Sequence, residues 1–96
     1  MQLFKPKNSR CSNGGSVQWS SKESIKYSNN KFIVEVWVDY QHKEGEGRVI
    51  YKSHIKEWTN SPENTKVTIS DEEKENIVKC IIEFLTKNGI YDVAVN

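Results

Sequence analysis

Alanine and leucine, which fill the core of most helical proteins, are nearly missing from this chain of 96 residues. It contains one Ala and two Leu, against nine Val and nine Ile, so its apolar side chains are mostly β-branched. Branched side chains pack well on a pleated sheet and lose rotamer freedom in a helix. An all-helical bundle is therefore excluded, and a strand-rich fold is expected.

Long apolar runs are also missing. The longest has three residues, whereas a membrane-spanning helix needs roughly 18, so no membrane segment is expected. The N-terminus lacks the apolar core of a secretory leader, and none is expected there. Because 35% of the residues are hydrophobic, we predict one small domain with a thin core.

Cysteine is scarce. Cys11 and Cys80 lie far apart and form no CxxC motif. Two free thiols in a reducing cytoplasm are the simpler interpretation, and a bridge between them is the alternative. On this basis the protein is predicted to be cytoplasmic.

Charge is unevenly distributed although the net charge is only +1. Residues 1–31 hold six basic side chains and a single acid, Glu23, whereas residues 32–96 hold eight basic and twelve acidic ones. Pro, Asn and Gly punctuate the start of the chain. We therefore predict an irregular basic N-terminal segment over residues 1–15, loosely attached to a single α+β domain over residues 16–96.

Alternation of apolar and polar residues predicts the strands. Runs at residues 16–20 and 24–28 are expected to form a hairpin, with Val17, Trp19, Ile25 and Tyr27 on its core side. Residues 31–40 give the strongest signal, and residues 48–52 continue as the next strand. The core face of the 31–40 strand is expected to carry Phe32, Val34, Val36, Val38 and Tyr40. Its other face is expected to carry Ile33, Glu35, Trp37 and Asp39.

One helix is predicted over residues 70–88. Ser70 and Glu73 have the spacing of a capping box, in which each side chain accepts a backbone N–H at the helix start. Apolar residues then recur along one face at Ile77, Val78, Ile81, Phe84 and Leu85. With a short final strand over residues 90–95, the pattern predicts a two-layer α+β domain. It has an antiparallel sheet of about four to five strands, covered on one face by this helix.

Signatures of catalysis are missing from the sequence. His42 and His54 do not have the spacing of metal ligands, and no Gly-rich phosphate loop or nucleophile elbow occurs. We therefore expect a protein that is not an enzyme and that uses neither a metal nor a cofactor.

The outer face of the 31–40 strand is the most informative feature for function. Glu35, Trp37 and Asp39 share it, and a Trp between two carboxylates is not expected beneath the helix. Either Val17 or Trp19 covers Trp37 across a neighbouring strand, or Trp37 is the exposed anchor of an interface for a protein partner. The predicted contact residues are Glu35, Trp37, Asp39, Glu44, Glu46, Glu57 and Trp58.

In its layout, the chain resembles the small immunity proteins of bacterial polymorphic toxin and contact-dependent growth inhibition systems. The resemblance rests on FIVEVWVDY, GRVIYK, IKEW and ISDEE leading into IVKCIIEFL and Gly89, and it covers about residues 16–95. These families have no diagnostic motif, so no site residue is carried over. The resemblance implies a protein that binds a cognate toxin domain and blocks it. Such toxins are often nucleases with basic active sites, which an acidic surface would complement.

Two further possibilities concern partners. Strand aromatics and basic residues could form a stacking platform for nucleic acid, in a small regulator that also uses the basic N-terminal segment. This alternative is the weaker one, because Glu35 and Asp39 would repel phosphate. A homodimer through an exposed sheet edge is also considered. The residues of the nucleic-acid platform would be Trp19, Tyr27, Trp37 and Tyr51 with Lys22, Lys26, Lys31, Arg48 and Lys52.

Overall fold

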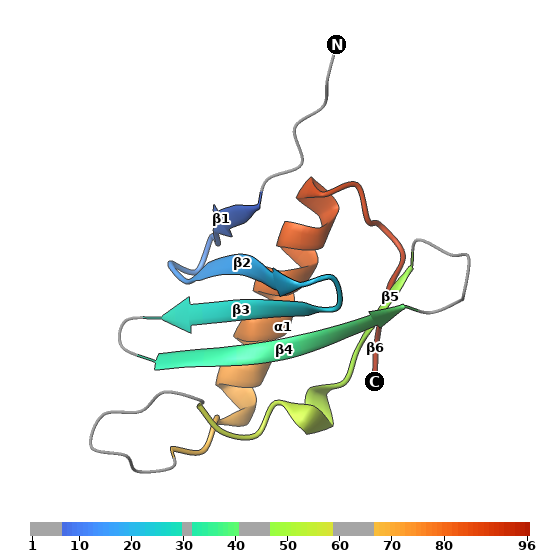
Figure 1. The fold of residues 1–96 in the computed structure, drawn as a ribbon. Helices are drawn as coiled ribbons and strands as arrows, with labels where there is room; N and C mark the ends of the chain where they lie inside the picture. The colour runs from blue at the N-terminus through green and yellow to red at the C-terminus, as the bar shows by residue number, and fades with distance from the viewer. Residues whose placement is uncertain (1–6, 30–31, 41–46, 59–66) are drawn as a thin grey trace.

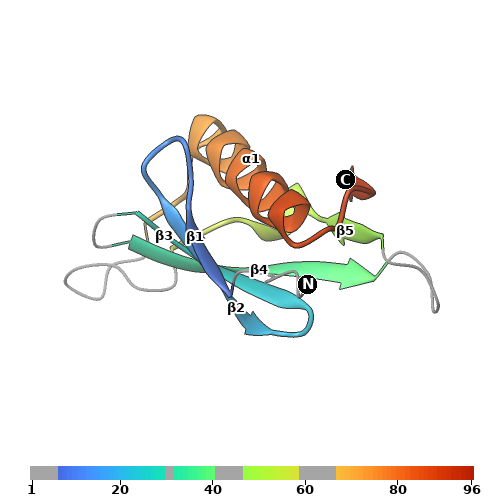
Figure 2. The same ribbon diagram turned by 90° about the horizontal axis from the view of Figure 1, so that it is seen from above.

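The structure is a computed structural model, and it describes residues 7–29, 32–40, 47–58 and 67–96. Within these residues six strands form one sheet, and a single α-helix lies across one face of it (Figure 1, Figure 2). The predicted two-layer α+β fold is confirmed, with one strand more than expected. The elements are β1 (Asn8–Arg10), β2 (Ser16–Ser21), β3 (Ser24–Asn29), β4 (Phe32–Tyr40), β5 (Arg48–Ile50), the 3₁₀ turn η1 (Lys52–His54), α1 (Asp71–Lys87) and β6 (Val93–Val95).

The strands lie in the sheet in the order in which they occur in the chain, β1-β2-β3-β4-β5-β6. Neighbours from β1 to β5 pair antiparallel, whereas β6 pairs parallel to β5, with Ile50 opposite Val95. The predicted final strand is therefore present but shorter than expected. Among the described residues, no helix is long and apolar enough to cross a membrane.

The core lies between the sheet and α1. The alternation predicted for β4 directs one set of its side chains into this core. Val34, Val36 and Val38 are buried, while Glu35 and Trp37 on the opposite face are exposed. The apolar residues predicted for β2 and β3 also face the helix. The fully buried side chains that complete this layer are Val17, Ile25, Tyr27 and Ile50.

The helix begins as the sequence predicts. Ser70 Oγ accepts a hydrogen bond from the Glu73 backbone N–H at 3.2 Å, and Glu73 Oε1 accepts one from the Ser70 N–H at 3.4 Å. This capping box satisfies two backbone donors that would otherwise lack partners. The predicted apolar stripe is buried against the sheet. Its members are Ile77, Val78, Cys80, Ile81, Phe84 and Leu85.

The N-terminal segment is not irregular throughout, and that prediction is wrong for residues 8–10. They form β1 and pair with β2, with Ser9 opposite Val17. The pairing extends to Lys7, whose carbonyl accepts a hydrogen bond from the Trp19 N–H at 3.1 Å. Polar side chains do not prevent this, because the edge strand is held through its backbone.

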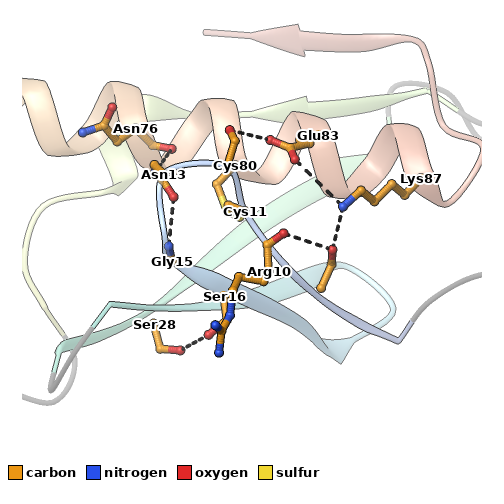
Figure 3. Close-up of a disulfide and its surroundings, with 12 residues drawn as sticks. Arg10, Cys11, Asn13, Gly15, Ser16, Ser28, Asn76, Cys80, Glu83 and Lys87 are labelled. Atoms are coloured by element: carbon orange, nitrogen blue, oxygen red, sulfur yellow. Dashed lines mark hydrogen bonds and ion pairs between the residues drawn. A yellow bond between two sulfur atoms is a disulfide. The ribbon is translucent and has the colours of Figure 1, made fainter.

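Cys11 and Cys80 form a disulfide, so the expectation of two free thiols is also wrong. Their Cα atoms are 5.4 Å apart, within the usual range for a bridge. Figure 3 shows the bond joining the loop between β1 and β2 to the middle of α1. Both cysteines are buried, so residues 8–11 are attached to the domain by a strand pairing and a covalent bond.

Polar contacts surround the disulfide on its solvent side (Figure 3). Ser12 Oγ donates to Glu83 Oε2 at 3.2 Å, and Lys87 Nζ donates to Ser9 Oγ at 2.9 Å. Asn13 Nδ2 donates to the Asn76 carbonyl at 3.3 Å. These bonds are exposed, so each contributes little by itself, and the disulfide is the main link between this loop and the helix.

Candidate functional site

The face of the sheet opposite α1, which we call the open face, presents polar side chains in rows across the strands. Antiparallel pairing aligns one row as Asn8, Gln18, Lys26 and Glu35, and a second as Arg10, Ser16, Ser28 and Ile33. Ser24 and Trp37 form the start of a third row. Figure 2 shows this side of β1 to β4 turned away from the helix.

The open face is electrostatically divided. A hollow of about 550 Å³ lies over β1, β2 and β3, where Arg10 and Lys26 supply positive charge among amides and hydroxyls. The acids Glu35 and Asp39 lie on β4. One face therefore carries a basic half and an acidic half side by side.

Trp37 lies on the acidic half and is 49% exposed. Glu35 and Asp39 flank it on the same face of β4, and we call these three residues the β4 patch. Val17 and Trp19 lie on the helix side of β2, so the interpretation that they cover Trp37 is wrong. An indole left half in water on a rigid strand can bury a large area on contact with a partner at a small cost in conformational entropy.

A cluster of serines lies beside Glu35. The Ser24 side chain is buried, and its Oγ lies 2.8 Å from Ser20 Oγ and 2.6 Å from Ser21 Oγ. Its distance to Glu35 Oε2 is 3.5 Å, a long hydrogen bond. Ser24 Oγ donates this bond to Glu35, and a hydrogen bond of this length is weak. The carboxylate is thus loosely oriented at one side of Trp37 and keeps most of its capacity to accept hydrogen bonds.

Trp58 does not belong to the β4 patch, and its prediction as a contact residue is wrong. It is 6% exposed and lies in the core. Its ring centroid lies 5.4 Å from that of Phe32 and 6.2 Å from that of Tyr27. Glu57 beside it is exposed, in an isolated β-bridge with Thr68.

Two further predicted contact residues, Glu44 and Glu46, lie outside the residues that the structure describes. The structure therefore brings together Glu35, Trp37 and Asp39 from the predicted set. Alternation along one strand predicts such a group, whereas the position of Trp58 depends on its contacts with Phe32 and Tyr27 from distant segments.

Arg48 is a buried residue that the sequence had assigned to a surface. Its guanidinium Cζ lies 3.8 Å from the centroid of the Tyr40 ring and 5.5 Å from that of Trp19. Its Nη1 donates to the carbonyls of Val38 and Lys22 at 3.0 and 2.9 Å. The guanidinium thus links the end of β4 to the turn before β3. Tyr40 was predicted on the core face, but it is 45% exposed and its ring covers the guanidinium.

The platform expected for nucleic acid is not assembled on one face. Trp19 and Tyr27 lie on the helix side of the sheet, and Arg48 is withdrawn into the core. Lys52 forms an ion pair with Glu75 on α1. Trp37 is left on the open face beside two acids.

Two titratable groups elsewhere in the described residues, Tyr27 and Glu75, have shifted pKa values. Burial raises the pKa of the Tyr27 phenol. The hydrogen bond from Lys52 lowers the pKa of the Glu75 carboxyl. Within the described residues no three His, Cys, Asp or Glu side chains are grouped as metal ligands.

Compared with known protein families, curated proteins and solved structures, the chain matches none of them. The open face and its residues are therefore interpreted from their own geometry.

Proposed function

We propose that the protein is a non-enzymatic binding protein that neutralises a cognate toxin domain through the β4 patch. The observation that carries the proposal is the half-exposed Trp37 between Glu35 and Asp39 on a paired strand. Interface anchors are commonly Trp or Tyr, and charges around them steer the approach of a partner of opposite sign. A toxin domain with a basic active site would complement this surface.

Trp37→Ala tests the anchor. The toxin domain would be sought in the gene immediately upstream, and protection would be scored by growth on co-expression. In titration calorimetry, the variant should bind the domain about 30-fold more weakly, since truncating a central anchor costs about 2 kcal/mol or more. The melting temperature should barely change, because half of the indole is already in water.

Tyr91→Ala is the matched control, because Tyr91 is also an exposed aromatic, at 78%, and lies between α1 and β6. It should leave both affinity and melting temperature unchanged. A lower melting temperature for Trp37→Ala with unchanged affinity would overturn the assignment. Equal losses of affinity in both variants would do so as well.

The acids are tested by charge reversal. Glu35→Lys with Asp39→Lys should slow association and reduce its dependence on salt, because surface charges act mainly on the association rate. Stopped-flow measurements at two salt concentrations would show this. An unchanged association rate would remove the electrostatic part of the proposal.

A nucleic-acid-binding regulator is the weaker alternative, since the residues expected for its platform lie on different faces. A cytoplasmic location stays a prediction from the sequence. The Cys11–Cys80 bond argues against it, because the cytoplasm keeps most thiols reduced. Rapid alkylation of cells, followed by a gel-shift assay for free thiols, would decide: labelled cysteines favour the cytoplasm, and unlabelled ones favour an oxidising compartment.

A further inference from the structure

One edge of β4 has a strand partner along only part of its length. On one side, β3 pairs with residues 32–37. On the other side, β5 pairs with residues 38–40 and stops there. Within the described residues, the edge from 32 to 37 on the β5 side therefore has no paired strand.

The direction of the backbone groups follows from alternation. The Val38 N–H donates to the Glu23 carbonyl at 2.7 Å, on the side of β3. Every second residue of a strand directs its N–H and C=O to the same edge, so those of Val34 and Val36 also point toward β3. Those of Ile33, Glu35 and Trp37 point to the opposite edge. In the described part of the chain, no strand pairs with Ile33 and Glu35 at this edge, whereas Trp37 directly adjoins the pairing of Val38 with Ile50.

Charge selects the kind of strand that this edge accepts. β4 contains Glu35 and Asp39 and no basic residue. Pairing with the same edge of a second copy would bring the two Glu35 carboxylates into one two-stranded ribbon, and like charges on adjacent strands repel. A basic strand would instead place an ammonium or guanidinium group beside Glu35, next to the exposed Trp37.

We propose that residues 32–37 of β4 accept an extended, basic segment of a protein partner as an added strand. Main-chain hydrogen bonds to Ile33, Glu35 and Trp37 would supply affinity, and the β4 patch would select basic side chains. The inference rests on the proposed function in taking the toxin domain as the source of that segment. The edge itself can be tested without the toxin.

The first measurement is amide hydrogen exchange by NMR on the free protein. The amides of Glu35 and Trp37 should exchange much faster than those of Val34 and Val36, which point toward β3. Equal protection of all four would show that the edge is already covered, and would overturn the inference.

The probe for binding is a synthetic nine-residue peptide in which Lys alternates with Thr or Val. Its addition should slow exchange at Glu35 and Trp37 and leave Val34 and Val36 unchanged. A peptide with Glu in place of each Lys is the charge control and should not bind. Failure of the Lys peptide to bind would overturn the inference.

Backbone methylation then separates strand addition from simple charge attraction. One peptide carries N-methyl groups on its Lys residues, and a second carries them on the residues between. In an added strand only one of these sets faces β4, so one peptide should lose about tenfold or more in affinity and the other should bind normally. If both methylated peptides bind, or if neither does, the peptide does not add to the β4 edge as a strand.

These outcomes are independent of the test of function. If the peptide binds the β4 patch without protecting the edge amides, strand addition is overturned while the toxin proposal stands. The protein could fail to protect cells from the toxin in the growth assay while the peptide still slows exchange at the edge amides. The proposed function would then be wrong, and strand addition at the β4 edge would stand.

Discussion

Breaking the Cys11–Cys80 bond should strongly destabilise this protein. The two cysteines are 69 residues apart, so the bond closes most of the chain into a loop. A cross-link restricts the unfolded chain by about 3 kcal/mol for a 15-residue loop and about 4.7 kcal/mol for a 100-residue loop. We therefore expect reduction to cost about 4 kcal/mol, a large share of the stability of a small domain.

The contacts that remain after reduction are weak. β1 has three residues, and the hydrogen bonds from Ser12 and Asn13 to α1 are exposed. Thermal melts followed by circular dichroism, with and without a phosphine reductant, would measure the effect. The melting temperature should fall by roughly 15 °C or more, since about 1 kcal/mol corresponds to roughly 4–8 °C in a domain of this size.

The matched control is the double variant Cys11→Ser with Cys80→Ala, which should melt like the reduced protein and should not respond to reductant. Mass spectrometry must confirm that both thiols of the wild type are free in the reduced sample. An unchanged melting temperature after complete reduction would refute the reasoning. From the sequence alone, residues 1–12 offer few apolar anchors, and their deletion is predicted to leave the fold intact. The structure reverses this expectation, because the deletion removes both β1 and Cys11.

Two further predictions concern packing. Ile81→Ala should cost about 2–5 kcal/mol in urea unfolding, because the side chain is fully buried beneath the sheet; a cost below about 1 kcal/mol would place the core elsewhere. Gly15→Ala should also destabilise, since a Cβ there would lie 2.6 Å from the Tyr27 hydroxyl. Gly14→Asn is the comparison, because Gly14 has open space and a φ of 94° that Asn tolerates better than most residues; an equal loss in both variants would exclude the clash.

The features predicted correctly from sequence are those encoded locally. The capping box of Ser70 and Glu73 and the apolar stripe of α1 follow from spacings within a few residues. The two faces of β4 follow from strict alternation over nine residues. In each case the signal lies within one element, so no knowledge of distant partners is needed.

The features that were missed depend on distant partners. The sequence Asn-Ser-Arg of β1 has little strand propensity, and it is held by its backbone pairing with β2. Trp58 was predicted as a contact residue of an exposed interface. Instead, Glu57 bridges to Thr68, and the indole of Trp58 packs beside the ring of Tyr27. Neither the pairing of β1 with β2 nor the packing of Trp58 can be predicted from the neighbouring sequence.

The buried guanidinium of Arg48 illustrates the same limit. A basic residue at the start of a short strand is normally interpreted as exposed. Here two backbone carbonyls accept its hydrogen bonds and two aromatic rings cover it, which offsets the cost of removing its charge from water. These partners come from four separate positions, so no short motif could have predicted the burial.

The acids on β4 have two possible physical explanations, and only one of them gives a role to Trp37. Charged residues beside an unpaired edge protect a protein from self-association, which would explain Glu35 and Asp39 without any partner. Such protection gives no reason for a large apolar ring between them, because an exposed Trp works against solubility. If protection were the whole explanation, Trp37→Thr would leave every binding property unchanged and would reduce self-association at high concentration. If the edge and the β4 patch act together on a basic strand, the same variant loses affinity for that strand while its edge amides still exchange rapidly in the free protein.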